Sequence, residues 1–158
     1  MKISSAEEYG LRCLLQLAKK ENNPVSAEEI ATNEDLSPAY TEKVLQILSK
    51  KGFVKSIRGA KGGYILTATP DEIMVGDVIK AMSTGAIEKC TTISKTSDTC
   101  IHFSNCGLRP LWKNIFKYIY HILDKTSLND LMKNEKAVYF ELNEQFSTLP
   151  ELKKTTTV

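Results

Sequence analysis

Residues 36–67 read LSPAYTEKVLQILSKKGFVKSIRGAKGGYILT, and this stretch decides the fold. Ser37 is a residue type that caps helices, and Pro38 costs no hydrogen bond in a first helical turn, where the N–H has no partner anyway. Gly52 can adopt the left-handed conformation that often ends a helix. The first half of the stretch therefore predicts a helix that ends at residues 50–52, with an inward face of Val44, Leu45 and Leu48.

The second half of the same stretch predicts a β-hairpin. Residues 53–57, FVKSI, are expected to form the first strand. Residues 58–63, RGAKGG, are rich in glycine and predict a turn, after which residues 64–67 return as a second strand.

Two more helices precede this stretch. The first is expected from Ser5 to about Lys20, opened by a capping box in which Ser5 pairs with Glu8. The second is expected to open at the cap Ser26 and to run to about Asn33. Two helices, a turn, a third helix and a hairpin form a winged helix-turn-helix, so we predict a mainly α fold with a small β-hairpin wing.

Downstream, a helix is expected from Pro70 through Met82 to a stop at Gly85, and a long amphipathic helix from Leu108 to about Thr126. A short helix follows the cap Ser127. Between the two longer helices, residues 88–105 fit neither a helical nor a strand period. We therefore predict four parts: a winged unit (1–85), a cysteine-bearing loop (86–107), a dimerisation helix with a short capping helix (108–145), and a flexible tail (146–158).

The composition is that of an ordinary globular protein. Of the 158 residues, 42% are apolar and 25% are charged, which suffices for a buried core. No run of 18 apolar residues occurs, and the first residues lack the apolar stretch of a signal peptide. We expect a cytoplasmic protein that does not enter a membrane.

The charge is distributed unevenly along the chain. Residues 37–64 contain six Lys or Arg and a single acidic residue, Glu42, whereas the remainder has 15 basic and 18 acidic residues. A short basic segment on a mildly acidic body is typical of a nucleic-acid site. A solvated charged face would give the same pattern, so the charge alone does not decide between the two.

A winged helix-turn-helix can place its third helix in the major groove of DNA and its wing against the neighbouring backbone or minor groove. Glu42 is suited to accept a hydrogen bond from a cytosine, while lysines hold phosphates and glycines let the wing approach closely. The alternatives are a plain hairpin turn with a half-buried Tyr40, or a winged helix that binds protein. The expected DNA contacts are Ser37, Ala39, Tyr40, Thr41, Glu42, Lys43, Lys50, Arg58, Lys61 and Gly62.

Three of the four cysteines, Cys90, Cys100 and Cys106, fall in the irregular segment. Thiolates are soft ligands that suit Fe–S clusters, zinc or copper(I), and the spacing differs from the paired knuckles of structural zinc. Zinc completed by His102 stays open, as does a redox dithiol of Cys100 and Cys106. Cys13 fits a small core position of the first helix. No Ser–His–Asp arrangement or phosphate loop appears, so we predict that the chain is not an enzyme.

Taken together, these motifs resemble the IscR/NsrR-type family of bacterial winged-helix transcription regulators, over nearly the whole chain. The similar stretches are Met1-Lys2-Ile3 with Tyr9-Gly10-Leu11-Arg12, Leu36 to Tyr40, the wing from Val54 to Tyr64, and Val75-Gly76-Asp77-Val78-Ile79. The three-cysteine loop followed by Leu111-Trp112 is similar to the cluster-binding branch of that family.

The resemblance implies a homodimer formed by the long helices, a palindromic double-stranded DNA operator, and an Fe–S cluster of two or four irons held by Cys90, Cys100 and Cys106. One branch of the family adds a histidine, but Arg109 occupies that position here. The other branch adds a carboxylate from the first helix of the partner subunit, which corresponds to Glu8, with Glu7 and His102 as weaker candidates. The implied function is a repressor switched by nitric oxide, redox state or iron supply. The alternatives are a thiol–disulfide sensor and a zinc-stabilised regulator.

Overall fold

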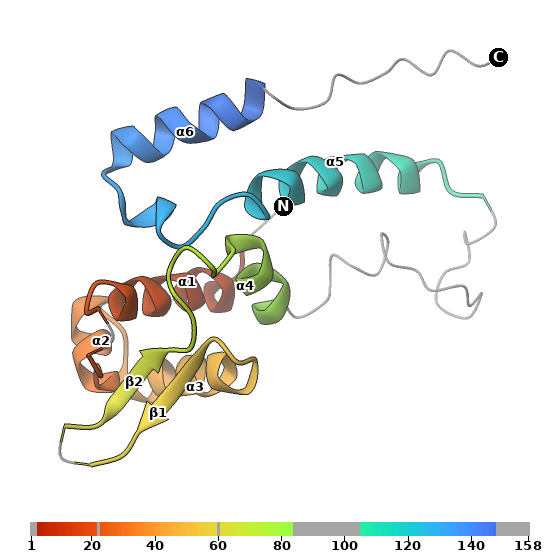
Figure 1. Cartoon of the computed structure of the whole chain (residues 1–158). Helices are drawn as coiled ribbons and strands as arrows, with labels where there is room; N and C mark the ends of the chain where they lie inside the picture. The colour runs from red at the N-terminus through yellow and green to blue at the C-terminus, as the bar shows by residue number, and fades with distance from the viewer. Residues whose placement is uncertain (1–2, 22, 60, 84–104, 148–158) are drawn as a thin grey trace.

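The computed structural model describes residues 3–21, 23–59, 61–83 and 105–147 (Figure 1). The elements in chain order are α1 (Ser5–Ala18), α2 (Ala27–Asn33), α3 (Pro38–Lys50), β1 (Val54–Ile57), β2 (Gly63–Leu66), α4 (Val75–Met82), α5 (Leu108–Leu123), a 3₁₀ turn (Asp130–Met132) and α6 (Glu135–Ser147). This mostly helical chain with one antiparallel hairpin confirms the predicted fold class. The role expected for α5 in dimer formation stays a prediction.

The first three helices share one apolar core. Leu14 of α1, Ile30 of α2, and Leu45 and Leu48 of α3 are fully buried against one another. Ser37 caps α3 as expected, because its hydroxyl accepts a hydrogen bond from the backbone N–H of Tyr40 at 3.3 Å. Gly52 follows the end of α3 with a φ of +84°, a conformation that other residue types rarely adopt.

The wing is attached to this helical unit through its backbone. β1 and β2 pair antiparallel, with Val54 opposite Leu66 and Ile57 opposite Gly63. Val25 and Tyr64 exchange two backbone hydrogen bonds, of 3.0 Å and 2.8 Å, which add the segment before α2 to the edge of β2. A Cβ atom on Gly63 would overlap the carbonyl oxygen of Val25. Glycine at this position is therefore what allows the wing to approach α2.

The N-terminal cap of α1 is Ser4, and the expected cap Ser5 is wrong by one residue. The Ser4 hydroxyl accepts from the backbone N–H of Glu7 at 3.3 Å, and the Glu7 carboxylate accepts from the backbone N–H of Ser4 at 2.7 Å. Glu7 is consequently buried, whereas Glu8 takes no part in the cap. In the sequence SSAEE each serine is followed three residues later by a glutamate, so the pattern alone does not show which serine is the cap.

The expected start of α4 at Pro70 is also wrong, because α4 begins at Val75. The chain before it pairs with the segment that follows α5. The Ile73 carbonyl accepts from the backbone N–H of Leu128 at 2.8 Å, and the Val75 N–H donates to the Thr126 carbonyl at 2.9 Å. These contacts between distant parts of the chain take backbone groups that a longer helix would have used, and the same pairing ends α5 at Leu123.

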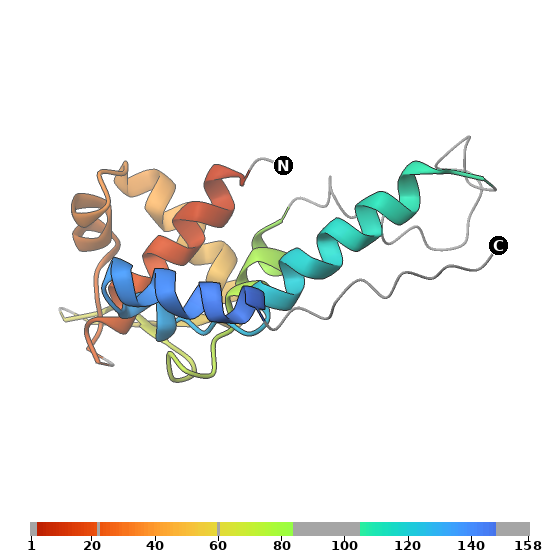
Figure 2. The same ribbon diagram turned by 90° about the horizontal axis from the view of Figure 1, so that it is seen from above.

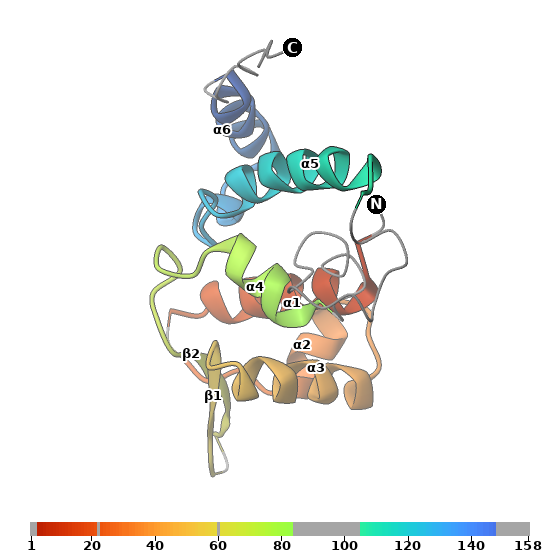
Figure 3. The ribbon, with the colours of Figure 1, turned by 90° about the vertical axis from the view of Figure 1, so that its right-hand side faces the viewer.

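The helices lie in layers, with α1 and α4 between α5 on one side and α3 on the other (Figure 3). The N-terminal half of α5 projects beyond the winged unit (Figures 1 and 2). α6 was not expected from the sequence. Its first turn is capped by Asn134, whose side-chain oxygen accepts from the Ala137 N–H at 3.0 Å. Among the helices that the structure describes, none has the length and apolar character needed to cross a membrane.

α4 and α5 meet at a tight joint. A Cβ atom on Gly76 would overlap the Asp124 carboxylate and lie 3.0 Å from the backbone nitrogen of Asp124. Lys80 donates to the Asp124 carboxylate at 2.7 Å and lies 5.1 Å from the centroid of the Tyr120 ring. These contacts set the position of α5 relative to the winged unit.

We expect Gly76→Ala to lower the free energy of unfolding by about 1–3 kcal/mol, because the added methyl group forces Asp124 away from α4. Urea denaturation followed by circular dichroism measures this loss. Gly107→Ala is the matched control, since nothing lies within 4 Å of a Cβ atom there. Equal stability of the two variants would contradict the tight joint.

Candidate nucleic-acid interface and cysteine loop

One side of α3 is free of protein contacts. Ala39, Lys43, Gln46 and Lys50 recur at three- and four-residue steps and are exposed, while the opposite face is buried in the core. Gln46 was not among the expected contacts, although the spacing between Lys43 and Lys50 points to it. Its amide can both donate to and accept from base edges in the major groove.

The basic residues of this region are exposed, and none of them forms an ion pair with an acidic residue that the structure describes. Of the residues that the structure describes, the cations paired with carboxylates are Arg12, Lys20, Lys80 and Lys133, none of which lies on α3 or the wing. In contrast, no ion pair within the described ranges involves the exposed cations of α3 and the wing, which are Lys43, Lys50, Lys51, Lys55, Arg58 and Lys61. This uncompensated charge lies on the opposite side of the molecule from α5 and α6 (Figures 1 and 3).

Two expected contact residues of α3 pack against other parts of the protein. Thr41 is fully buried, so its predicted contact with DNA is wrong: the side chain points into the core and cannot reach a base. The ring of Tyr40 packs edge-on against the ring of Tyr9, with 5.7 Å between the centroids. Tyr40 is half-buried, which leaves only part of its side chain for a partner. Ser37 and Ala39 are exposed at the start of the helix.

Glu42 is joined to the wing. The Tyr64 hydroxyl donates a hydrogen bond of 2.7 Å to Oε1 of Glu42. Burial, together with this bond and the nearby carboxylate charge, raises the pKa of Tyr64 to about 12. The hydroxyl therefore remains protonated, and able to donate, at neutral pH. Sequence reasoning did not single out this pair, because the two residues are 22 positions apart.

Glycines shape the turn of the wing. A Cβ atom on Gly62 would overlap the Ile57 carbonyl oxygen and lie 2.8 Å from that of Gly59. Gly62 is therefore required by the close packing of the turn itself. On either side of this turn Arg58 and Lys61 are exposed, as a wing that contacts DNA needs.

The cysteine loop is described only at its end. Cys90, Cys100 and His102 lie outside the described residues, while Cys106 is half-buried just before α5 and forms no disulfide. Cys13 is fully buried in α1, as expected for a core residue, and burial followed by the Glu34 charge raises the pKa of its thiol to about 12. Within the described ranges, no group of three His, Cys, Asp or Glu side chains could hold a metal.

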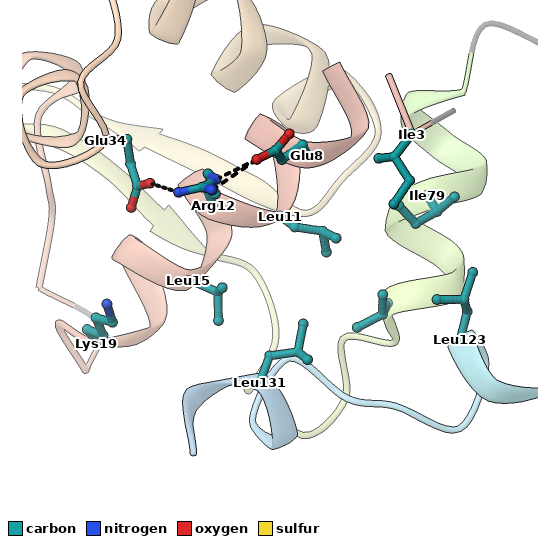
Figure 4. Close-up of a pocket in the computed structure, with 11 residues that line it drawn as sticks. Ile3, Glu8, Leu11, Arg12, Leu15, Lys19, Glu34, Ile79, Leu123 and Leu131 are labelled. Carbon is teal, nitrogen blue, oxygen red and sulfur yellow. Dashed lines mark hydrogen bonds and ion pairs between the residues drawn. The ribbon is translucent and has the colours of Figure 1, made fainter. Parts of the chain in front are cut away.

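Glu8 lies on the exposed side of α1. Its carboxylate pairs with Arg12 at 2.9 Å, and the same guanidinium pairs with Glu34 of the turn before α3 at 3.2 Å (Figure 4). Both glutamates raise the pKa of Arg12, and the hydrogen bond that Arg12 donates to Glu34 has the largest effect. The Glu8 side chain keeps 51% of its accessible surface, so it can reach a partner outside the chain.

An apolar groove begins beside Glu8. It has a volume of about 530 Å³ and lies between α1, α4 and the segment after α5 (Figure 4). Leu11 and Leu15 of α1 face Ile79 of α4 across it, and Leu123 and Leu131 line its remaining side.

Comparison with known proteins identifies the family. The family model Rrf2, described as "Iron-dependent Transcriptional regulator", matches residues 3–134. The chain belongs to the Rrf2 family. The regulator CymR of Bacillus subtilis is 38% identical over 132 residues, which is 83% of this chain and 89% of that protein. The regulator IscR of Aliivibrio salmonicida is 34% identical over 139 residues (87% and 80%), and NsrR of B. subtilis 31% over 140 (87% and 94%).

Solved structures agree with this assignment. The structure of CymR, "the Global Cysteine Regulator of B. subtilis", superposes with a TM-score of 0.68 at 36% identity and covers 84% of this chain and 96% of that one. The oxidised form of Staphylococcus aureus CymR gives a TM-score of 0.66 at 33% identity, with 85% and 98% covered. The relatives are named transcriptional regulators, so this chain is a transcription regulator and not an enzyme, as predicted.

We expect Lys43→Ala and Arg58→Ala each to weaken binding to duplex DNA of any sequence, because each removes a cation that has no acidic partner in the protein. Each should also reduce the slope of log affinity against log salt concentration by about 0.9. Fluorescence anisotropy of a labelled duplex at several salt concentrations measures both effects. Lys136→Ala, an exposed lysine of α6, is the control, and an equal effect there would argue against a DNA surface on α3 and the wing.

Proposed function

We propose that this Rrf2 regulator acts in the cytoplasm as a dimeric repressor that binds its operator through α3 and the wing. The uncompensated positive charge of that surface is the observation that carries the proposal. Phosphate contacts by lysine and arginine supply most of the non-specific affinity for DNA, while contacts to base edges supply the choice of sequence. The proposed contacts are Ser37, Ala39, Tyr40, Glu42, Lys43, Gln46, Lys50, Arg58, Lys61 and Gly62, without Thr41.

A homodimer is supported by the apolar side of α5. No residue of this 16-residue helix is buried. Leu108 is 62% exposed and Trp112 42%, and Leu111 and Ile115 lie on the same side. Apolar side chains of this size that recur along one helix are typical of an interface between subunits. A second copy with the same helix offers a matching surface, because a two-fold interface is self-complementary.

A palindromic operator follows from such a dimer. Two recognition helices related by a two-fold axis bind two half-sites in opposite orientation, roughly 34 Å apart along the DNA. The position of α5 relative to α3 within each subunit then sets the distance between the two recognition helices. The joint of Gly76, Lys80 and Asp124 fixes that position in the monomer.

For the regulatory signal we propose an Fe–S cluster held by Cys90, Cys100 and Cys106, with Glu8 of the partner subunit as the fourth ligand. The description of the family as iron-dependent supports the choice of iron. Cys106 is accessible and outside any disulfide, whereas the raised pKa of Cys13 keeps that thiol protonated and unsuited to bind metal. Glu8 is exposed, while Glu7 is occupied by the capping box.

When bound, a cluster links the two subunits. Oxidation, nitrosylation or loss of iron removes this link. The residues of this chain determine how strong the link is. Glu8 must leave Arg12 to reach a metal, and Arg12 keeps Glu34 when it does. A carboxylate is a harder and weaker ligand for iron in such a cluster than a thiolate, which favours the lability that a sensor needs.

A thiol switch is the second candidate, and the relative CymR favours it. One solved relative is an oxidised form of CymR, and another is described as a global cysteine regulator. In this chain Cys100 and Cys106 would form a disulfide when a peroxide accepts two electrons and the two thiol protons, yielding water. Cys106, only half-buried and outside any disulfide, supports this chemistry as well.

We expect anaerobically purified wild-type protein to be coloured and to contain iron and sulfide, because the proposal has its three loop cysteines bind an Fe–S cluster. Cys106→Ala should be colourless and Glu8→Ala should lose its iron faster in air. Absorbance spectra with iron and sulfide assays measure these properties. Cys13→Ala is the matched control and should keep its cluster.

A colourless, iron-free anaerobic protein would overturn the cluster proposal. If this iron-free protein forms a Cys100–Cys106 disulfide when treated with peroxide, as detected by mass spectrometry, the thiol-switch proposal replaces the cluster proposal. Bound zinc would indicate a zinc-stabilised regulator. An unchanged cluster in Glu8→Ala would remove Glu8 as an essential ligand while leaving the cysteines in place.

We expect Leu111→Glu to dissociate the dimer, because it places a charge in the centre of the apolar side of α5. Sedimentation velocity at micromolar concentration should show a dimer for the wild type and a monomer for this variant. Lys113→Glu introduces the same residue on the other side of the helix and should remain dimeric. A monomeric wild type would contradict the proposed assembly.

A further inference from the structure

The bond between Tyr64 and Glu42 links the wing to the only acidic residue of the basic segment. Glu42 lies in the second turn of α3, half-buried beside the exposed Ala39, Lys43 and Gln46. Its Oε1 accepts from the Tyr64 hydroxyl at 2.7 Å. Within the described ranges, its second oxygen, Oε2, has no hydrogen bond or ion pair. The carboxylate is thus held at one oxygen and open at the other.

Tyr64 is itself firmly placed. Its backbone N–H and carbonyl both pair with Val25, and it lies opposite Ser56 in the β-hairpin. The ring packs against the hydrophobic core of the winged unit. A tyrosine side chain has only two rotatable bonds, so a fixed backbone and a packed ring leave the hydroxyl little freedom. The donor to Glu42 is therefore held in place before any DNA binds.

We propose that Tyr64 is a positioning residue for base choice, orienting Glu42 so that Oε2 faces a cytosine in the major groove. The proposal rests on the proposed DNA-binding function. A carboxylate only accepts hydrogen bonds, and cytosine presents only a donor, its N4 amino group, in the major groove. Adenine also has a donor, but its neighbouring N7 acceptor repels a carboxylate. Because one oxygen is fixed by Tyr64, less conformational freedom is lost when the other oxygen binds the base.

A positioning role and a purely structural role of Tyr64 have different effects on which DNA sequences are bound. A bond that only anchors the wing would contribute equally to every DNA sequence, because the wing contacts the backbone or minor groove. A bond that orients Glu42 changes the preference at one base position in each half-site. The distribution of bound sequences therefore separates the two roles, which a single affinity measurement does not.

The test uses a pool of duplexes with randomised positions, from which the full-length protein selects bound sequences for sequencing. The wild type should prefer cytosine at one position of each half-site, and Glu42→Ala should abolish that preference. Tyr64→Phe retains the ring and should lower the same preference roughly three- to tenfold, with other positions unchanged. In the Glu42→Ala background, Tyr64→Phe should have no further effect there. Tyr139→Phe, an exposed tyrosine of α6, is the matched control.

Glu42→Gln gives a second, directional readout. If the Tyr64 hydroxyl donates to the amide oxygen, the amide nitrogen must face the base, and nitrogen is a donor. The preference should then move from cytosine to guanine or thymine, whose major-groove edges present acceptors. In the double variant Glu42→Gln, Tyr64→Phe, the amide can turn either way and this preference should broaden.

Each outcome decides between the roles. If Tyr64→Phe weakens binding to all sequences alike, or leaves the cytosine preference intact, Tyr64 is an anchor and the proposal fails while DNA binding by α3 stands. If the wild type shows no cytosine preference that depends on Glu42, base reading by Glu42 fails as well. Failure to enrich any sequence would overturn the proposed function itself. Thermal melting of each variant verifies that it is folded.

Discussion

Two backbone hydrogen bonds between Val25 and Tyr64 hold the wing against the helical unit, and the relative position of α3 and the wing depends on them. They form only because Gly63 lacks a side chain where it passes the Val25 carbonyl. From this point Tyr64 reaches Glu42 of α3, so the wing and the third helix have one fixed relative position. The basic residues on both elements then act as a single surface. Backbone pairing suits this purpose, because its geometry is independent of the side chains that contact DNA.

Much of the fold could be predicted from local pattern, because its signals act over a few residues. The cap Ser37, the left-handed Gly52 and the glycine-rich turn of the wing each depend on neighbouring backbone only, and all appear in the structure. The start of α4 was predicted wrongly because distant segments compete there for the same backbone groups. The turn before α4 pairs with residues 126–128, which no local pattern at Pro70 reveals.

Some features of the candidate site could likewise be predicted from local sequence pattern, and others could not. Exposure of Lys43, Arg58 and their neighbours follows from helical spacing and charge, so the basic surface could be predicted. The burial of Thr41 could also have been predicted, because it lies three and four residues before Val44 and Leu45 and therefore on the inward face of α3. The roles of Glu7 and Glu8 depended on a one-residue choice between two serines, which decides which carboxylate is buried and which is available.

Under the proposed function, a signal at the cysteine loop can reach α3 by two routes of different strength. The pairs from Glu8 to Arg12 and from Arg12 to Glu34 share the half-exposed guanidinium of Arg12, and such surface pairs contribute about 0–1 kcal/mol. Moving a two-state equilibrium from 1:99 to 99:1 needs about 5.5 kcal/mol, which these pairs cannot supply. The connection of α5 to the winged unit is firmer, because Ile73 and Val75 form backbone hydrogen bonds with Leu128 and Thr126, which follow α5. Movement of α5 therefore carries the winged unit with it, and this rigid connection is the stronger route.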